Sequence, residues 1–500
     1  MDNKLKKGLV KNTSLNLVSS LINRIGALIF TIILARFLLP ERFGLYTLAL
    51  SIALFVISFA DLGINTTLIR YISFSLKKQK KKINSYYRYL LRIKFYLILF
   101  FSLLLLILAY PLSLYVFKKQ VLILPLLVAS FYIFILSLEN FFASLFYAIK
   151  KVKYVAIRES MLQFIRIGLA LIVVYFITDP YKVTGIFAAL ILTSLLVLTF
   201  VYSSLRRLAP EIFEFSKEKI DKARLKKFIG FLTIGTLSAL FFSYIDSIML
   251  GIFLSSQYVG YYKSAISLIT VLIAPLLALN VVLLPDLTQI TKSKLKPIIN
   301  HAFRFIFILT IPAIFGFFAL GKYFIRILYG PAYLPAYLPL YFLAITIFPV
   351  VCVGLLVSLF SAREKPAIFA KLVSITVVLN IILNFILIKY LLKFSPIWAT
   401  AGAAIATLAS WTIYFVASIY LTKKELGISP SLSKAVKPLI ASLIMFAALM
   451  YILNIITDMT IILGLVTIIF GAVIYFLAML LMKGFNKTDL NIIKILFKSK

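Results

Sequence analysis

Five charged residues lie inside long apolar stretches of this 500-residue chain: Arg24, Asp61, Glu139, Arg166 and Asp246. A charge at the centre of a bilayer costs about 2.5–3.5 kcal/mol on insertion scales, so such a side chain must face a partner or a cavity. A buried guanidinium can bind an anionic group. A buried carboxylate can take up a proton or a cation, so these residues are the first candidates for a functional site.

Arg24 and Asp61 are expected at similar depths, because Arg24 lies 12 residues before Arg36 and Asp61 lies 17 residues after Gly44. Arg36 and Gly44 lie at the outer turn between the two helices. At 1.5 Å per residue, Arg24 and Asp61 therefore lie about 18 Å and 25 Å below that turn. An ion pair between two neighbouring helices is therefore feasible. In a functional interpretation, Arg24 binds an anionic substrate and Asp61 releases it in an ion-coupled step. In a structural one, the two residues form a permanently buried bridge.

Amide side chains recur at corresponding places in the chain. Gln163 lies about one helical turn before Arg166, and Asn380 follows Gln163 by 217 residues. Asn384 extends the second polar stripe by one further turn. These amides could bind sugar hydroxyls, or could hydrogen-bond neighbouring helices for a gain of about 0.6 kcal/mol per contact.

The elements that position these residues are membrane-spanning helices. Hydrophobic residues make up 63% of the chain, with a mean hydropathy of +1.06, which is more apolar surface than a water-soluble fold can bury. A spanning helix needs about 20 mostly apolar residues. We predict an all-α polytopic membrane protein with fourteen transmembrane helices, near 12–37, 44–70, 92–117, 120–148, 157–178, 182–205, 226–254, 258–290, 298–320, 334–361, 366–391, 397–422, 435–456 and 459–482.

The net charge of +37 follows the order of these spans. Lys and Arg concentrate in the N-terminal segment, in alternate connections and in the C-terminal tail, and basic short loops stay in the cytoplasm. We therefore predict a multi-pass protein of the cell (cytoplasmic) membrane with both termini in the cytoplasm, and no nucleic-acid partner. One Cys and one His offer neither a disulfide nor a metal-ligand spacing, so no metal and no cofactor are expected.

The chain contains an internal repeat. Residues 31–46 align with 247–262 without a gap and share six identities, among them Gly44 and Gly260, which we expect to allow a tight reversal between two helices. Near the ends of the copies, 184–193 align with 401–410 at almost the same offset. We predict two parallel six-helix lobes and two extra C-terminal helices, with boundaries at 1–205 (N-terminal lobe), 206–225 (cytoplasmic linker), 226–422 (C-terminal lobe) and 423–500 (helices 13–14 and an amphipathic tail).

Four stretches resemble one family: "LARFLLPERFGLYTLALSIALF" with the following "ADLGINTTLIRY" (34–71), "YGPAYLPAYLPLYFLAI" (329–345), "NIILNFILI" (380–388) and "GAAIATLAS" (402–410). Together with the predicted spans they resemble the polysaccharide transporters of the O-antigen flippase type, within the multidrug/oligosaccharidyl-lipid/polysaccharide exporter superfamily. The resemblance implies two six-helix lobes that flip polyprenyl- or dolichyl-linked oligosaccharide across the membrane. A cationic cavity would bind the pyrophosphate-sugar head, and a gradient of protons or Na⁺ would drive the cycle.

The resemblance assigns roles to residues of its first stretch and to Arg24, which lies shortly before that stretch. Arg24 and Arg70 would bind substrate and Asp61 would couple transport to the ion, although Arg70 lies close enough to a helix end to reach water. Burial alone adds further candidates: for substrate binding Arg166, Gln163 and Asn380, and for ion coupling Glu139 and Asp246. The expected partners are the lipid-linked oligosaccharide, the coupling ion and membrane lipids. We expect a monomer, with glycan-assembly enzymes as candidate partners.

Three other functions stay open. A multidrug exporter of the same superfamily would bind a cationic amphiphile through Asp61, Glu139 and Asp246. A peptidoglycan-precursor flippase would bind a closely related lipid-linked sugar. A membrane glycosyltransferase would need acidic residues on an outward loop, where the first such turn holds only Glu41.

Overall fold

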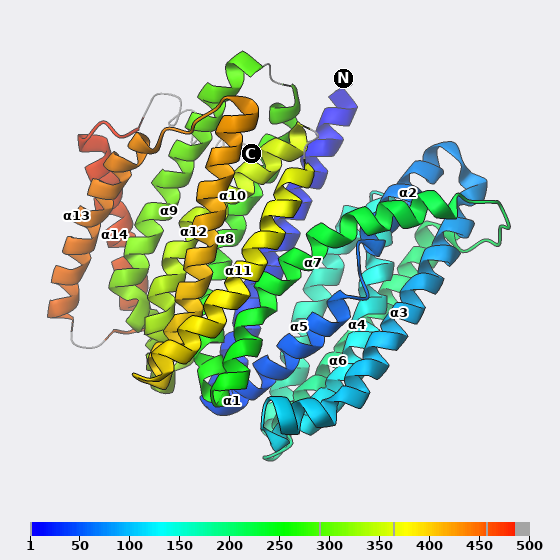
Figure 1. Cartoon of the computed structure of the whole chain (residues 1–500), viewed down its shortest axis with the longest axis horizontal. Helices are drawn as coiled ribbons and strands as arrows, with labels where there is room; N and C mark the ends of the chain where they lie inside the picture. Colours follow the sequence, from blue (N-terminus) through cyan, green and yellow to red (C-terminus); the bar gives the residue numbers. More distant parts are fainter. Residues whose placement is uncertain (1–2, 290–291, 364–365, 457–458, 486–500) are drawn as a thin grey trace. The chain divides into compact units, whose positions relative to one another are not determined.

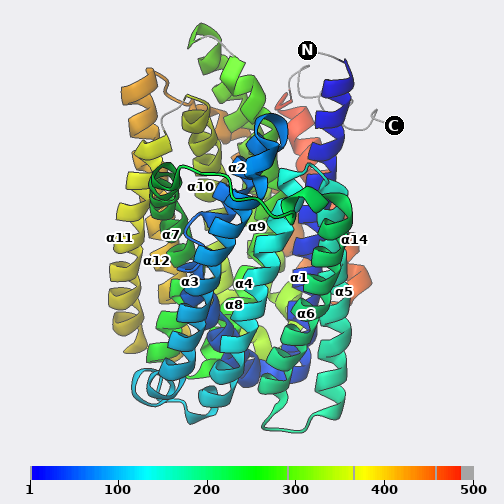
Figure 2. The same ribbon diagram turned by 90° about the vertical axis from the view of Figure 1, so that its right-hand side faces the viewer.

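The computed structural model describes residues 3–289, 292–363, 366–456 and 459–485, and within these ranges the regular structure is helical, with no strand. Figures 1 and 2 show the helices from two directions. Their bounds are α1 (Asn3–Ser58), α2 (Ile64–Lys78), α3 (Ile83–Pro111), α4 (Ile123–Ala148), α5 (Val152–Phe176), α6 (Lys182–Leu208), α7 (Lys222–Phe253), α8 (Ser256–Gln289), α9 (Lys292–Tyr329), α10 (Tyr337–Ala362), α11 (Pro366–Leu392), α12 (Pro396–Leu426), α13 (Val436–Ile455) and α14 (Ile461–Leu481).

Twelve described segments are long and apolar enough to cross a membrane, which makes the chain a multi-pass membrane protein. The expected count of fourteen spans is not confirmed. The segment Ser20–Ser58 contains two of the expected spans.

A kink divides α1 at Leu39, whose φ of 58° and ψ of 168° are not helical. Pro40 follows directly, and a residue before proline is disfavoured in the helical region. The chain therefore reverses at Leu39, and the reversal predicted at Gly44 is wrong, because Gly44 is helical. Gly260 is likewise inside α8.

The two glycines of the repeat serve a close approach instead. A Cβ on Gly44 would lie 1.7 Å from the Ser256 carbonyl oxygen, and a Cβ on Gly260 would lie 2.5 Å from the Pro40 carbonyl oxygen. Ser256 follows Pro40 by 216 residues, the same separation as between the glycines. The contact is therefore symmetric, and each copy of the repeat presents the same positions to the other.

The span predicted over 44–70 is interrupted between α1 and α2. Turns replace the helix over residues 59–63, and Leu62 and Gly63 adopt left-handed backbone angles, with φ of 39° and 75°. Thr233 of α7 donates a hydrogen bond to the Leu62 carbonyl oxygen at 3.3 Å. Asp61, expected inside a continuous helix, lies in this interruption.

The chain divides into two compact units, Met1–Pro275 with Ala370–Ala403, and Leu276–Phe369 with Ala404–Lys500. The lobe boundaries inferred from the repeat remain a prediction. In the first unit, α4 packs against α2, α3 and α6, and α1 packs against α5 (Figures 1 and 2).

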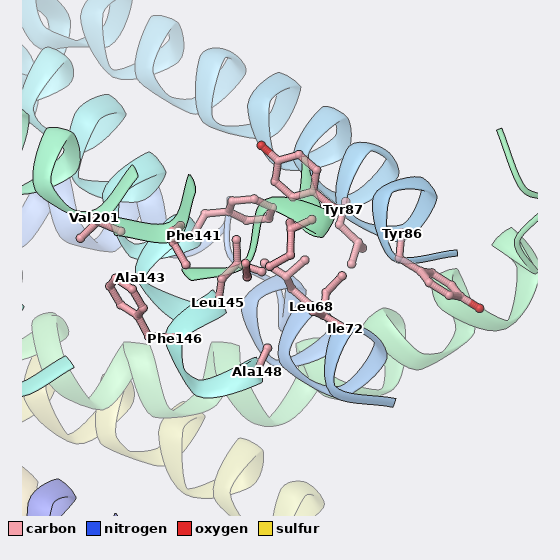
Figure 3. Packing of buried hydrophobic residues seen from close by; sticks show 14 of the residues in the cluster. Leu68, Ile72, Tyr86, Tyr87, Phe141, Ala143, Leu145, Phe146, Ala148 and Val201 are labelled. Atoms are coloured by element: carbon pink, nitrogen blue, oxygen red, sulfur yellow. The ribbon is translucent and has the colours of Figure 1, made fainter. Parts of the chain in front are cut away.

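Buried side chains fix the position of α4 in the first unit. Figure 3 shows Phe141 and Phe146 of α4 in a cluster with Leu68 of α2, Tyr87 of α3 and Val201 of α6. Phe141, Phe146 and Leu68 are fully buried. α4 is thus a central support, and the polar groups on it have fixed positions.

In the second unit, α9 packs against α10, α13 and α14. The Tyr475 hydroxyl of α14 donates a hydrogen bond to the Ile308 carbonyl oxygen of α9 at 2.8 Å. The amphipathic helix expected over 486–500 lies outside the described residues.

Candidate functional site

The first polar site, which we call the guanidinium site, lies between α1 and α5. Arg166 stacks over the ring of Phe30, with 4.6 Å between the guanidinium carbon and the ring centroid. Gln163 donates a hydrogen bond from Nε2 to Asn23 Oδ1 at 2.9 Å. The helices come this close because Gly26 has no side chain: a Cβ there would lie 2.6 Å from Cγ of Gln163.

Several buried polar atoms of the guanidinium site form no hydrogen bond with a described residue. Nε and Nη2 of Arg166 and Oε1 of Gln163 are buried without a hydrogen-bond partner among the described residues. Buried polar groups are rarely left without a partner. A cation with two free donors beside an amide is suited to an anionic, hydroxyl-bearing ligand.

The second polar site, the carboxylate site, joins α7, α8 and α11. Asn384 donates from Nδ2 to Asp246 Oδ1 at 2.9 Å and to Asn380 Oδ1 at 3.2 Å. The Tyr262 hydroxyl donates to the other carboxylate oxygen of Asp246. Asp246, Asn380, Asn384 and Tyr262 are all buried, and Asn384 Oδ1 has no hydrogen-bond partner among the described residues.

The oxygens of the carboxylate site suit a hard cation. Carboxylate and amide oxygens are the ligands that such ions prefer. Across the described ranges, no group of three or more His, Cys, Asp or Glu side chains could hold a metal ion. Any ion here would therefore depend on one carboxylate and neutral oxygens, which also leaves Asp246 as a proton acceptor.

The two sites occupy equivalent positions of the repeat. Three residue pairs follow the offsets of 216 and 217: Phe30 with Asp246, Tyr46 with Tyr262, and Gln163 with Asn380. Tyr46 packs edge-on against Phe30 with ring centroids 6.5 Å apart, where Tyr262 instead bonds Asp246. One copy of the repeat thus carries a buried cation and the other a buried carboxylate.

A third site surrounds the interruption between α1 and α2. Lys94 of α3 donates from Nζ to Asp61 Oδ1 at 3.1 Å and to the Ala60 carbonyl oxygen at 3.3 Å. Beside this ion pair lies a cavity of about 150 Å³, which we call the helix-break cavity. Its polar lining comprises the ion pair and Ser58, Asn65, Ser137, Asn140 and Tyr244.

A buried charge cluster supports this cavity from α4 and α5. Arg158 donates from Nε to Glu139 Oε1 at 2.6 Å and from Nη2 to Glu139 Oε2 at 2.7 Å, a two-pronged contact. Its Nη1 donates to Glu159 at 2.5 Å, and Nη2 also donates to Asn140 Oδ1 at 2.7 Å. Asn140 thereby joins the cluster to the cavity.

The charged residues that the sequence singled out in α1 and α2 do not form the ion pair that was expected of them. Among the described residues no ion pair joins Arg24 to Asp61: Asp61 pairs with Lys94, and Arg24 is exposed. Arg70 is exposed on α2 and stacks over Phe228, 4.5 Å from the ring centroid. The depth estimate did not include the rotation of each helix, which decides whether two side chains meet.

Lys94, Arg158 and Glu159 were missed from the sequence. They lie within the first three residues of the spans expected over 92–117 and 157–178, where charges are typical of the head-group region. In the structure α3 begins at Ile83 and α5 at Val152, so all three lie more than one turn inside their helices. A buried carboxylate such as Glu139 needs a cationic partner. A search for that partner could have identified Arg158 from the sequence.

Comparison with known proteins follows this geometry. A family model described as "Polysaccharide biosynthesis protein" matches residues 9–291. No curated protein sequence matches the chain.

Several solved structures share the fold. The lipid II flippase MurJ in an inward closed conformation is 17% identical with a TM-score of 0.73, over 92% of this chain and 97% of MurJ. An inward-facing multidrug resistance MATE family transporter of the MOP superfamily is 14% identical with a TM-score of 0.64, over 81% and 95% of the two chains. A MOP superfamily transporter from Pyrococcus furiosus is 13% identical with a TM-score of 0.58, over 85% and 97%. Since the family model covers more than half of the sequence, the chain belongs to the polysaccharide biosynthesis protein family and has the fold of MOP superfamily transporters.

Proposed function

We propose that the protein is a flippase that moves lipid-linked oligosaccharide across the cell (cytoplasmic) membrane by ion-coupled alternating access. Its substrate is an oligosaccharide joined through pyrophosphate to a polyprenyl or dolichyl carrier. It is a transporter and not an enzyme, has both termini in the cytoplasm, and acts as a monomer beside glycan-assembly enzymes.

One observation carries this proposal: the guanidinium site, with its buried free donors, and the carboxylate site, with its free amide oxygen, are built from corresponding helices of the two copies of the repeat, although Asp246 itself corresponds to Phe30 and not to Arg166. Arg166 binds the pyrophosphate, because guanidinium donors match phosphate oxygens in geometry and charge. Gln163 Oε1 accepts a hydrogen bond from the adjoining sugar. The exposed Arg24 and Arg70 attract the head group before it enters.

The carboxylate site couples the cycle to an ion. A proton or Na⁺ at Asp246 is held by Asn384 Oδ1, the Asn380 amide and the Tyr262 hydroxyl, and neutralises a charge that is costly inside the membrane. Each inward charge contributes about 2.3 kcal/mol per 100 mV of membrane potential. Glu139 is a second candidate for coupling, although its two oxygens already accept from Arg158.

A multidrug exporter fits these contacts less well. Two of the three carboxylates that a cationic drug would need are already paired with a cationic side chain: Asp61 with Lys94, and Glu139 with Arg158. A peptidoglycan precursor presents the same pyrophosphate-sugar chemistry, so only a comparison of head groups separates it from an oligosaccharide.

Reconstituted vesicles test the proposal. Purified protein is placed in vesicles with a fluorescent short-chain polyprenyl pyrophosphate carrying an oligosaccharide, and flipping is read as the fraction that an impermeant quencher reaches. We expect Arg166→Gln to weaken substrate binding roughly 10- to 100-fold, the range for losing a hydrogen bond to a charged group. Asp246→Asn should keep binding and lose stimulation by a Na⁺ or proton gradient.

The matched control is Arg224→Gln, which removes an exposed cation of α7 and should leave transport unchanged. A parallel arm offers the peptidoglycan precursor and a cationic amphiphile. Vesicles that extrude the amphiphile and flip neither lipid-linked sugar would refute the proposal.

A further inference from the structure

We infer that the helix-break cavity is a saccharide subsite, which receives one neutral, hydroxyl-rich sugar ring of the transported head group. The inference rests on the proposed function and adds to it a place for the sugar, separate from Arg166. It follows from the charge, the unused polar atoms and the size of the cavity.

The charge of the cavity favours a neutral ligand. Asp61 and Lys94 are its charged lining residues, and their opposite charges lie 3.1 Å apart. A cation attracted by Asp61 is repelled by Lys94. An anion attracted by Lys94 is likewise repelled by Asp61. A neutral ligand avoids both penalties, and its hydroxyl groups can still form charge-assisted hydrogen bonds with both residues.

The polar atoms of the cavity are ready for hydroxyl groups. Asn65 Oδ1 is buried and has no hydrogen-bond partner among the described residues, so it needs a donor. Asn140 accepts from Arg158 through Oδ1, which leaves its Nδ2 group to donate. Donors and acceptors therefore lie side by side, as a ligand whose hydroxyls both donate and accept requires.

Access and size agree with one sugar ring. The Asp61 side chain is 38% exposed while Lys94 is 1% exposed, so the cavity opens on the side of the carboxylate. Its volume is about 150 Å³. A cavity of about this volume in another protein holds benzene, so the space accepts a six-membered ring whose inner hydroxyls meet the polar wall and whose remaining substituents lie at the opening. Tyr244 adds an aromatic ring and a hydroxyl to the wall.

A pair of ligands tests the subsite: short-chain polyprenyl pyrophosphate without sugar, and the same lipid carrying a disaccharide. Binding of both to the full-length protein in nanodiscs is measured by native mass spectrometry, and the ratio of the two affinities isolates the sugar. We expect Asn65→Leu to lower this ratio roughly tenfold, as expected when a buried hydrogen bond is lost, with sugar-free binding unchanged. Tyr244→Phe removes one hydroxyl at nearly constant volume and should lower the ratio about threefold.

Asn454→Leu is the matched control, because it makes the same change at an exposed position of α13 and should leave the ratio at the wild-type value. Unchanged sugar-free binding shows that a variant is folded, and Tyr244→Phe decides the question if Asn65→Leu does not fold. Wild-type ratios in both cavity variants would overturn the subsite and leave the flippase intact. A wild-type protein that binds neither ligand would overturn both proposals.

Discussion

Arg158 makes more charged contacts than any other side chain described above, and it makes them in a largely buried environment. Its guanidinium engages Glu139 at two points and Glu159 at one, and Glu139 is completely buried. Replacing one partner of such a pair leaves a buried charge without compensation, which costs far more than the pair contributes. The residue therefore maintains the positions of α4 and α5, on which Asn140 and Arg166 depend.

Arg158→Met should lower the free energy of unfolding by about 3–5 kcal/mol, because Glu139 and Glu159 then face each other inside the membrane without a cation. Thermal unfolding in detergent measures the change. Arg224→Met, the same substitution at an exposed position, is the control. Equal melting temperatures for the two variants would contradict the supporting role assigned to Arg158.

At the scale of elements, a lysine from another part of the first unit caps the C-terminal end of α7. Lys119, between α3 and α4, donates from Nζ to the carbonyl oxygens of Gly251 at 2.6 Å and Leu254 at 2.9 Å. The last carbonyls of a helix have no partner within it and carry the negative end of its dipole. Burial lowers the pKa of Lys119 because it disfavours the charged ammonium, and the two carbonyl oxygens offset this effect. They hold the end of the helix that carries Asp246.

Lys119→Met should reduce the free energy of unfolding by about 1–3 kcal/mol, the cost of leaving buried acceptors without a donor. Hydrogen exchange at the end of α7 should rise in the same variant. Lys118→Met removes a neighbouring exposed charge and serves as control. Exchange at residues 250–254 that is the same in both variants would show that Lys119 does not cap the helix.

The elements could be located from the sequence wherever lipid sets their length. The stretches expected over 120–148 and 366–391 correspond to α4 and α11, because an apolar run of spanning length has few alternatives in a bilayer. The interruption at Asp61 could not be foreseen, since nothing in "FADLGIN" forbids a helix. Its left-handed Leu62 and Gly63 are held by Thr233, a contact between residues far apart in sequence.

At the scale of the whole molecule, the internal repeat was the most informative feature of the sequence. It also shows which features of the candidate site could not be predicted from the sequence. It aligned Gln163 with Asn380, and both amides are buried in the structure. It did not reveal that Asp246 is the counterpart of Phe30, because an acidic and an aromatic residue at these positions show no similarity. The pairing of Asp61 with Lys94 required the rotation of two helices about their axes, which periodicity over a uniformly apolar segment does not give. The roles of these residues stay predictions.

The symmetric contact of the repeat gives a prediction at this scale. Gly44→Ala and Gly260→Ala should each lower the melting temperature, because a Cβ at either position meets a carbonyl oxygen of the other copy. The double variant should cost less than the two single costs added, since helices separated for one methyl group have room for the second. Gly168→Ala, with no atom within 4 Å of the added carbon, is the control. Strictly additive costs would mean that the two glycines do not share one contact.

The same contact shows what two copies in one chain can do that two identical chains cannot. Two identical half-length chains meeting through this glycine would touch as Gly44 and Gly260 do, in the manner of a two-fold homodimer. In such an assembly one gene dictates both partners, and whatever stands at the position of Phe30 stands also at that of Asp246. An acid in one half and a stacked ring beside Arg166 in the other become available only after fusion, when each half can mutate alone. A single chain with two unlike copies can therefore hold a guanidinium beside a ring in one copy and a carboxylate at the position of that ring in the other.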